Sequence, residues 1–118
     1  MLNQSHALDR TFRALADPAR RAMLDRLARG SASVSELAAP LDMSLPAVVQ
    51  HLAVLEDSGL VRSSKQGRVR TCMLEPRTLR TAESWIADRR ALWDGRLDAL
   101  GRYLDETKSP TRNRRSRK

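Results

Sequence analysis

Cationic side chains around a single glycine are the groups in this chain best suited to binding chemistry. Gly67 is flanked on both sides by basic residues: Arg62, Lys65, Arg68 and Arg70. We expect them to gather near the tip of a β-hairpin, where guanidinium and ammonium groups bind phosphate oxygens. By itself, a charged hairpin is more often a solvated sheet edge that resists pairing with other strands. The neighbouring sequence therefore has to decide between these two interpretations.

A second candidate is the outer face of the helix expected just before this hairpin, between Ser44 and Gly59. Ser44 is a good N-cap, Pro46 suits the first helical turn, and Gly59 suits the end of a helix. At 100° per residue, three apolar side chains form a stripe that we expect to be buried: Val48, Leu52 and Leu55. The opposite face carries no lysine or arginine and comprises Pro46, Val49, Gln50, Ala53 and Asp57, with Leu45 at its edge.

This outer face has the composition of a surface that approaches the edges of DNA bases closely. The amide of Gln50 suits N6 and N7 of adenine, and Val49 suits the methyl group of thymine. The alternative is a helix partly buried in a larger core, an interpretation that the adjacent basic hairpin makes weaker. His51, on the flank of the helix, either reaches a phosphate or bonds locally, and the sequence leaves both open.

Three shorter helices are expected before this one. The first covers residues 5–16. The second begins after its cap Asp17, ends at Gly30, and turns four side chains inward: Met23, Leu24, Leu27 and Ala28. In the third, which is expected to be short, Ser33 and Glu36 form a capping box. Together with the next helix it makes a helix-turn-helix, a motif whose second helix enters the DNA major groove.

A long helix is expected over residues 77–106, with an apolar stripe too broad for a small domain to bury alone. The stripe repeats every seven residues and is widened on both sides: Leu79, Ile86, Trp93 and Leu100, with Leu97, Leu104, Trp85, Leu92 and Ala99. Such repeats pair the helices of two chains, and we therefore expect a dimer. The alternative is a helix that packs only on its own domain.

The net charge of +8 arises mainly in the last eleven residues. Residues 108–118 hold six basic side chains and no acidic one, whereas the other sixteen Lys and Arg face fourteen Asp and Glu. We expect residues 1–107 to form one domain and residues 108–118 a disordered basic arm that adds non-specific phosphate contacts. The arm indicates a polyanionic partner without identifying it.

The composition disfavours several other classes of protein. No apolar run approaches the roughly 20 residues that span a membrane, and the start lacks the pattern of a secretory signal, so we expect a cytoplasmic protein. A lone cysteine, Cys72, excludes an internal disulfide. Neighbouring arginines could favour its thiolate for a redox switch, but burial under the hairpin is the favoured interpretation. No catalytic set of side chains is recognisable, so no enzymatic activity is expected.

Three segments together resemble the ArsR-type winged-helix repressors. They read FRALADPARR (residues 12–21), VSELA (34–38) and SLPAVVQHLAVLEDSGLV (44–61). The similarity is close over residues 7–75, and the order of elements agrees to residue 104. The resemblance implies a mainly α-helical winged helix-turn-helix domain of five helices with a small β-hairpin wing.

The resemblance also implies a homodimer that represses transcription from a pseudo-palindromic operator. Its first and last helices would form the interface, through Leu8, Phe12, Ile86, Trp93, Leu97, Leu100 and Leu104. The recognition helix and the wing would supply the DNA-binding residues, namely Ser44, Leu45, Pro46, Val49, Gln50, His51, Arg62, Lys65, Arg68 and Arg70. Position 49 is commonly serine in the family, so Val49 is a departure.

Metal-sensing members resemble one another in a cysteine pair near the third helix, or in Asp and His ligands along the last helix. This chain has neither pattern, and His6, His51 and Cys72 cannot make a three- or four-ligand soft-metal site from one subunit. We therefore expect a member without metal or cofactor. Release from DNA would come from an unidentified small molecule, from oxidation of Cys72, or from no signal at all.

A different class of function stays open beside binding to double-stranded DNA. The apolar surface of Leu45, Val49 and Ala53 could dock a helix of a partner protein, in a winged-helix interaction module without sequence-specific DNA binding. A gel shift with the DNA upstream of the chain's own gene separates the two, because an interaction module gives no sequence-specific shift.

Overall fold

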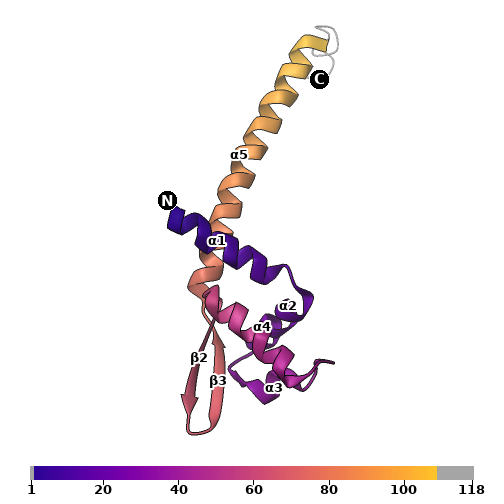
Figure 1. Cartoon of the computed structure of the whole chain (residues 1–118). Helices are drawn as coiled ribbons and strands as arrows, with labels where there is room; N and C mark the ends of the chain where they lie inside the picture. Colours follow the sequence, from indigo (N-terminus) through magenta and orange to yellow (C-terminus); the bar gives the residue numbers. More distant parts are fainter. Residues whose placement is uncertain (1, 109–118) are drawn as a thin grey trace. The chain divides into compact units, whose positions relative to one another are not determined.

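The computed structural model describes residues 2–108, with the side chains of 6–107, and the chain divides into two units, Met1–Ala82 and Glu83–Lys118. The elements in chain order are α1 (Leu2–Leu15), α2 (Pro18–Leu27), β1 (Ala32–Ser33), α3 (Val34–Ala38), α4 (Leu45–Asp57), β2 (Val61–Gln66), β3 (Val69–Leu74) and α5 (Pro76–Lys108) (Figure 1). Over residues 2–108, this confirms a mainly α-helical fold of five helices with a small wing, β2 to β3 (residues 61–74). Almost all of the predicted basic arm lies outside the described residues.

The helices begin where the predicted capping side chains bind the free backbone N–H groups. Asp17 accepts hydrogen bonds from the N–H groups of Arg20 (3.1 Å) and Ala19 (2.8 Å), which lower the pKa of its carboxyl group. Ser33 and Glu36 exchange the two hydrogen bonds of a capping box, at 2.8 and 3.1 Å. Both caps therefore confirm the expected helix starts.

The wing belongs to a three-stranded antiparallel sheet with the strand order β1-β3-β2. Ala32 and Ser33 of β1 pair with Cys72 and Thr71 of β3. Strand β1 is absent from the prediction because two residues are too few to show the alternating pattern of a strand. Since Ser33 also caps α3, this pairing fixes the start of the helix-turn-helix against the wing.

The core of the first unit is built mainly from small and branched apolar side chains. Its largest fully buried members are Met23, Leu37, Leu52, Leu55, Val48, Val61 and Cys72. The buried stripe of α4 is thereby confirmed. The prediction that Ala28 points inward is wrong: α2 ends at Leu27, and Ala28 is its exposed C-cap. Helix α1 begins at Leu2, three residues earlier than predicted.

Helix α5 is 33 residues long and contains the whole predicted segment 77–106. Between Glu83 and Thr107 its side chains are exposed in the single chain, including those of the apolar stripe. Within this second unit, the Arg89 guanidinium lies 4.6 Å from the centre of the Trp85 ring, a cation–π contact. No helix in the described part of the chain is long and apolar enough to cross a membrane.

Substitution of Gly59, which follows α4, tests how tightly this end of the helix is packed. The φ of Gly59, +83°, is left-handed, and an added Cβ would lie 3.0 Å from Thr78 Oγ1, which donates a hydrogen bond to the Gly59 carbonyl oxygen at 2.6 Å. We expect Gly59→Ala to lower the free energy of unfolding in urea by about 1–2 kcal/mol from backbone strain alone. Displacement of Thr78 adds to this loss.

Gly67→Ala is the matched control, because Gly67 is also left-handed (φ +63°) but has no atom within 4 Å of an added Cβ. Gly67→Ala should lower the free energy of unfolding only by the contribution of backbone strain. Equal losses in the two variants would contradict the steric part of the prediction.

Candidate nucleic-acid interface

The outer face of α4 is an exposed surface of almost uncharged side chains. Ser44 caps the helix where this surface begins. Leu45 is 53% and Val49 43% exposed, and Pro46 and Gln50 are exposed beside them. In the single chain, the alternative of a helix half buried in a larger core is therefore wrong, and the predicted groove-facing residues share one accessible face.

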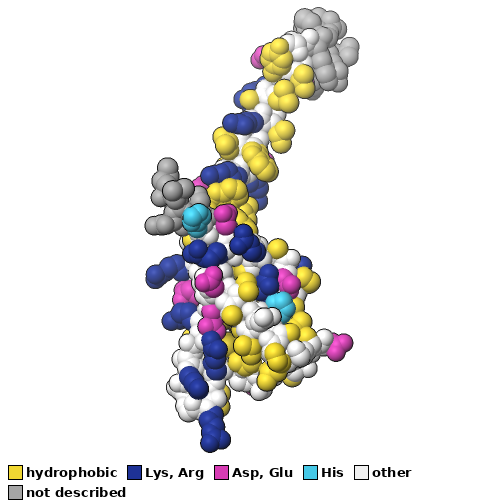
Figure 2. All heavy atoms as spheres, viewed as in Figure 1, with side chains coloured by type: hydrophobic (Ala, Val, Ile, Leu, Met, Phe, Trp, Pro, Cys, Tyr) yellow, Lys and Arg dark blue, Asp and Glu magenta, His cyan; other side chains and the backbone are white. Residues whose placement is uncertain are grey.

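The basic side chains of the wing divide between its two faces. Cross-strand partners share a face of a sheet, so Arg70 and its partner Lys65 lie on the side that also carries buried Cys72. Arg62 lies on the other face, and Arg68 lies in the turn at the tip, between β2 and β3. Lys and Arg side chains extend along the hairpin to this tip (Figure 2). The four cations therefore do not form one cluster.

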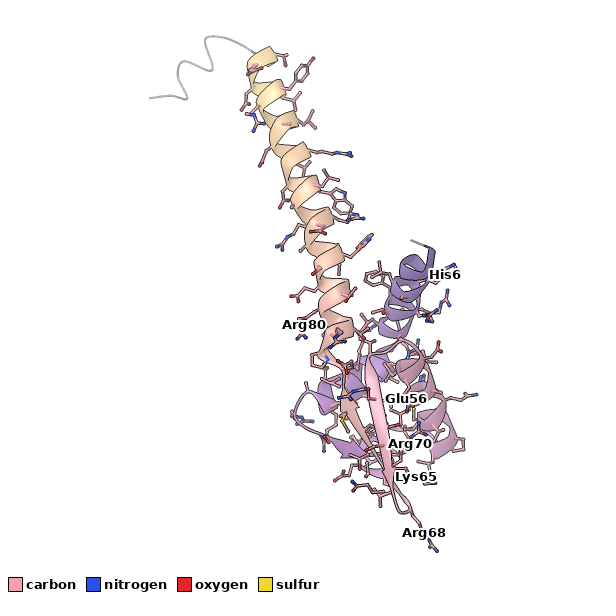
Figure 3. All side chains as sticks on the ribbon, turned by 90° about the vertical axis from the view of Figure 1, so that its left-hand side faces the viewer. His6, Glu56, Lys65, Arg68, Arg70 and Arg80 are labelled. Carbon is pink, nitrogen blue, oxygen red and sulfur yellow. The ribbon has the colours of Figure 1, made fainter. Side chains whose placement is uncertain are left out.

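Arg70 is bound to α4 rather than left free in solvent. Its Nη2 donates to both carboxylate oxygens of Glu56, at 2.6 and 2.7 Å, and its Nε donates to Ser63 Oγ at 3.0 Å (Figure 3). Ser63 in turn donates to Glu56 Oε2 at 3.2 Å, which closes a ring of hydrogen bonds. We call Glu56, Ser63 and Arg70 the wing–helix triad. The sequence pattern does not identify Glu56 and Ser63, because their meeting depends on how the wing packs on α4.

Two of the four cations remain available to a ligand. Arg62 is paired through its Nε with Glu75 Oε1 at 2.8 Å. Lys65 and Arg68, by contrast, are exposed and make no hydrogen bond or ion pair within the described part of the chain. These two residues could bind phosphate without first breaking a contact. The side chain of Arg68 projects from the tip in Figure 3.

The imidazole ring of His51, on α4, is hydrogen-bonded to Arg20 of α2. The Arg20 Nη1 lies 3.2 Å from His51 Nδ1, while its Nε and Nη2 donate to the carbonyl oxygens of Ala14 (2.8 Å) and Arg13 (2.9 Å). A guanidinium group only donates, so Nδ1 must be the acceptor and neutral His51 carries its proton on Nε2. Local bonding of Nδ1 is confirmed, and Nε2–H is left as a donor for a phosphate. Arg20 lies in the FRALADPARR segment, the one sequence signal that marks it.

Cys72 is fully buried in β3, directly opposite Ser63 of β2. Burial raises the pKa of its thiol, and the charge of Glu56 raises it further, while Arg70 acts in the opposite direction. Arg70 therefore favours the thiolate, as suggested, but burial and the charge of Glu56 outweigh it and the net shift favours the neutral thiol. The interpretation of a small buried residue under the wing is confirmed.

The predicted dimer contacts belong to both units. Leu8 and Phe12 of α1 are half-buried in the first unit. The residues predicted from α5 are all exposed: Ile86, Trp93, Leu97, Leu100 and Leu104. Their pairing with a second copy stays a prediction. In the described part of the chain, no three His, Cys, Asp or Glu side chains gather in a group that could hold a metal ion.

Known proteins share the segment that carries this surface. A helix-turn-helix domain matches residues 15–64, which contain the whole of α4. The HTH-type transcriptional regulator Rv2034 of Mycobacterium tuberculosis is 39% identical over 97 residues, covering 82% of this chain and 88% of the relative. The transcriptional repressor SdpR of Bacillus subtilis is 25% identical over 79 residues, covering 67% and 88%. The crystal structure of an ArsR family transcriptional regulator is 50% identical, with a TM-score of 0.71 over 80% of this chain and 94% of that one.

Arg20→Lys tests the link between α2 and His51. Arg20 meets its three acceptors through three separate nitrogen atoms, and the single nitrogen of lysine cannot lie close to all of them. We therefore expect the His51 ring to lose its fixed tautomer and the free energy of unfolding to fall by about 1–2 kcal/mol. The ring ¹⁵N chemical shifts report the tautomer directly.

Arg21→Lys provides the control, because the Arg21 Nη1 donates to the Leu15 carbonyl oxygen (2.7 Å) and does not contact the ring. The ring shifts should stay at their wild-type values in this variant. Unchanged shifts in Arg20→Lys as well would refute the positioning of His51 by Arg20.

Proposed function

The chain belongs to the ArsR-type family of winged helix-turn-helix transcriptional regulators, and we propose that it represses transcription as a homodimer on a pseudo-palindromic operator. The family is a DNA-binding, non-enzymatic class. The observation that carries the proposal is the exposed, nearly uncharged outer face of α4 beside a wing with two unpaired cations. The similarity to the repressor SdpR supports repression as the outcome of binding.

In the proposed complex, α4 supplies sequence preference and the wing supplies affinity. Gln50 pairs with adenine and Val49 packs on a thymine methyl, because the outer face lets the helix approach the base edges. Lys65 and Arg68 bind phosphates, which releases counterions and makes the affinity depend on salt. His51 adds a phosphate contact through Nε2–H.

The homodimer is proposed to form through α1 and α5. The stripe of α5 exposes a row of large apolar side chains, and such contiguous patches usually mark interaction surfaces. A two-fold axis between two copies would place their recognition helices in successive major grooves about 34 Å apart. A pseudo-palindromic operator would match this symmetry.

The regulator is further proposed to act in the cytoplasm without a resident metal or cofactor. Residues 108–118 would add non-specific phosphate contacts through their basic side chains. Because burial raises the pKa of the Cys72 thiol, oxidation of this residue is a poor inducing signal. A small-molecule effector of unidentified chemistry, or control by expression level alone, fits the chain better.

Two single substitutions test the division of labour between helix and wing. Gln50→Ala should reduce the preference for operator over random DNA by about tenfold, because a bidentate base contact contributes about 1–3 kcal/mol of discrimination. Arg68→Gln should weaken binding to both DNAs equally. It should also reduce the slope of log affinity against log salt concentration by about 0.9 per chain. Fluorescence anisotropy with the upstream DNA and a random duplex, over a range of salt, measures both effects.

Arg80→Gln is the control for lost charge, since Arg80 lies on α5 away from the wing tip (Figure 3). It should leave the salt dependence close to that of the wild type. Equal losses on both DNAs for Gln50→Ala and Arg68→Gln would contradict the division of labour. If the wild-type protein shows no preference for the upstream DNA over random DNA, the protein-interaction module is favoured. The exposed Leu45 and Val49 would then provide its docking surface.

Leu97→Glu tests the proposed dimer, because Leu97 belongs to the α5 stripe and is 65% exposed. Loss of one buried leucine from each copy should raise the dimer dissociation constant about a hundredfold or more, as measured by sedimentation. Ala91→Glu adds the same charge on the side of the helix away from the stripe, where the side chain is exposed. It should leave the dimer intact, and equal effects of the two variants would exclude the stripe as the interface.

A further inference from the structure

The wing–helix triad is the side-chain connection between the wing and α4. Glu56 lies in the last turn of α4, Ser63 on β2 and Arg70 on β3. Within the described residues, no other side-chain hydrogen bond or ion pair joins the wing to this helix. The contacts of Glu56 with Arg70 are short and charge-assisted, so they are the strong kind of hydrogen bond.

The triad also marks where the wing stops being packed. Cys72 lies directly opposite Ser63 and is fully buried, whereas residues 64–70 are all exposed. The base of the wing is fixed by the pairing of β1 with β3 and by burial of Val61 and Cys72 in the core. Residues 64–70 lie beyond this base, and the triad is what ties the exposed part of the wing to α4 by polar side chains. A hairpin of this length without further support is free to bend.

Glu56 further controls how much positive charge the wing presents. Lys65 and Arg70 are cross-strand partners on the same face, and Arg68 follows at the tip. Of these three cations, only Arg70 has a carboxylate partner. Without Glu56, a third free cation would join Lys65 and Arg68.

We propose that Glu56 is a specificity-determining positioning residue, which fixes the angle of the wing to α4 and keeps Arg70 away from DNA phosphates. This inference rests on the proposed DNA-binding function. A fixed wing brings Lys65 and Arg68 to the backbone only when α4 is seated in its groove. A loose wing with three free cations binds any duplex, so the carboxylate restrains non-specific binding.

Glu56→Gln tests the proposal on DNA, because the amide keeps the shape of the side chain but not its charge. Affinity for random DNA should rise about threefold to tenfold, and the preference for upstream DNA over random DNA should fall. The slope of log affinity against log salt concentration should steepen by about 0.9 per chain. Asp25→Asn removes the same charge from α2, where the exposed carboxylate makes no hydrogen bond or ion pair within the described residues. This variant should show less than half of each change. No gain in affinity for random DNA for Glu56→Gln, or an equal gain for Asp25→Asn, would overturn the proposal.

The labelling rate of the Cys72 thiol measures the contact between Glu56 and Arg70 in the absence of DNA. Opening of the wing exposes the thiol to a disulfide reagent. Arg70→Gln should speed this labelling at least fivefold, although removal of a nearby cation by itself raises the pKa of the thiol and slows the reaction. Arg62→Gln breaks the ion pair with Glu75 on the other face and should leave the rate within about twofold. Unchanged or slower labelling of Arg70→Gln would refute the positioning role.

The two measurements separate failure of this inference from failure of the proposed function. If the wild-type protein binds no DNA while Arg70→Gln still opens the wing, the proposed function fails and the positioning role stands. If the wild type binds its upstream DNA but neither Glu56→Gln nor Arg70→Gln behaves as expected, only the role of Glu56 fails.

Discussion

Burial of one stripe of α4 is the constraint on which the rest of this structure depends. Val48, Leu52 and Leu55 are each at most 1% exposed, and burial of three such side chains contributes roughly 5 kcal/mol or more. That is comparable to the whole stability of a small domain. Rotation of the helix about its axis would forfeit this contribution, so the core itself holds Val49 and Gln50 outward. The surface that we propose to contact DNA bases is therefore the one that the core leaves exposed.

The electrostatics of the wing depend on carboxylates that lie elsewhere in the chain. Glu56 at the end of α4 forms an ion pair with Arg70, and Glu75 after β3 forms one with Arg62. Both ion pairs are partly exposed, so each contributes little to stability. In the proposed complex their larger effect is on function, because they leave Lys65 and Arg68 as the unpaired cations of the wing.

Much of the fold was predictable because its signals are local. A cap and the N–H groups that it binds lie three residues apart at most, so the spacing of Asp17, Ser33 and Ser44 from their helices suffices. The buried stripe of α4 follows in the same way from helical geometry. Strand β1 and the exposure of Ala28 were not predictable, since a two-residue strand and the last turn of a helix carry no periodic signal.

By itself, the sequence therefore determined the order of the helices, the outward face of α4 and the basic character of the wing. Only the tertiary structure decided that Arg70 is bound by Glu56, that Arg20 contacts His51, and that the charge of Glu56 adds to burial in raising the pKa of the Cys72 thiol. The physical reason is the same in each case. These contacts join residues on different elements, and their distances are set by packing of the core rather than by spacing along the chain.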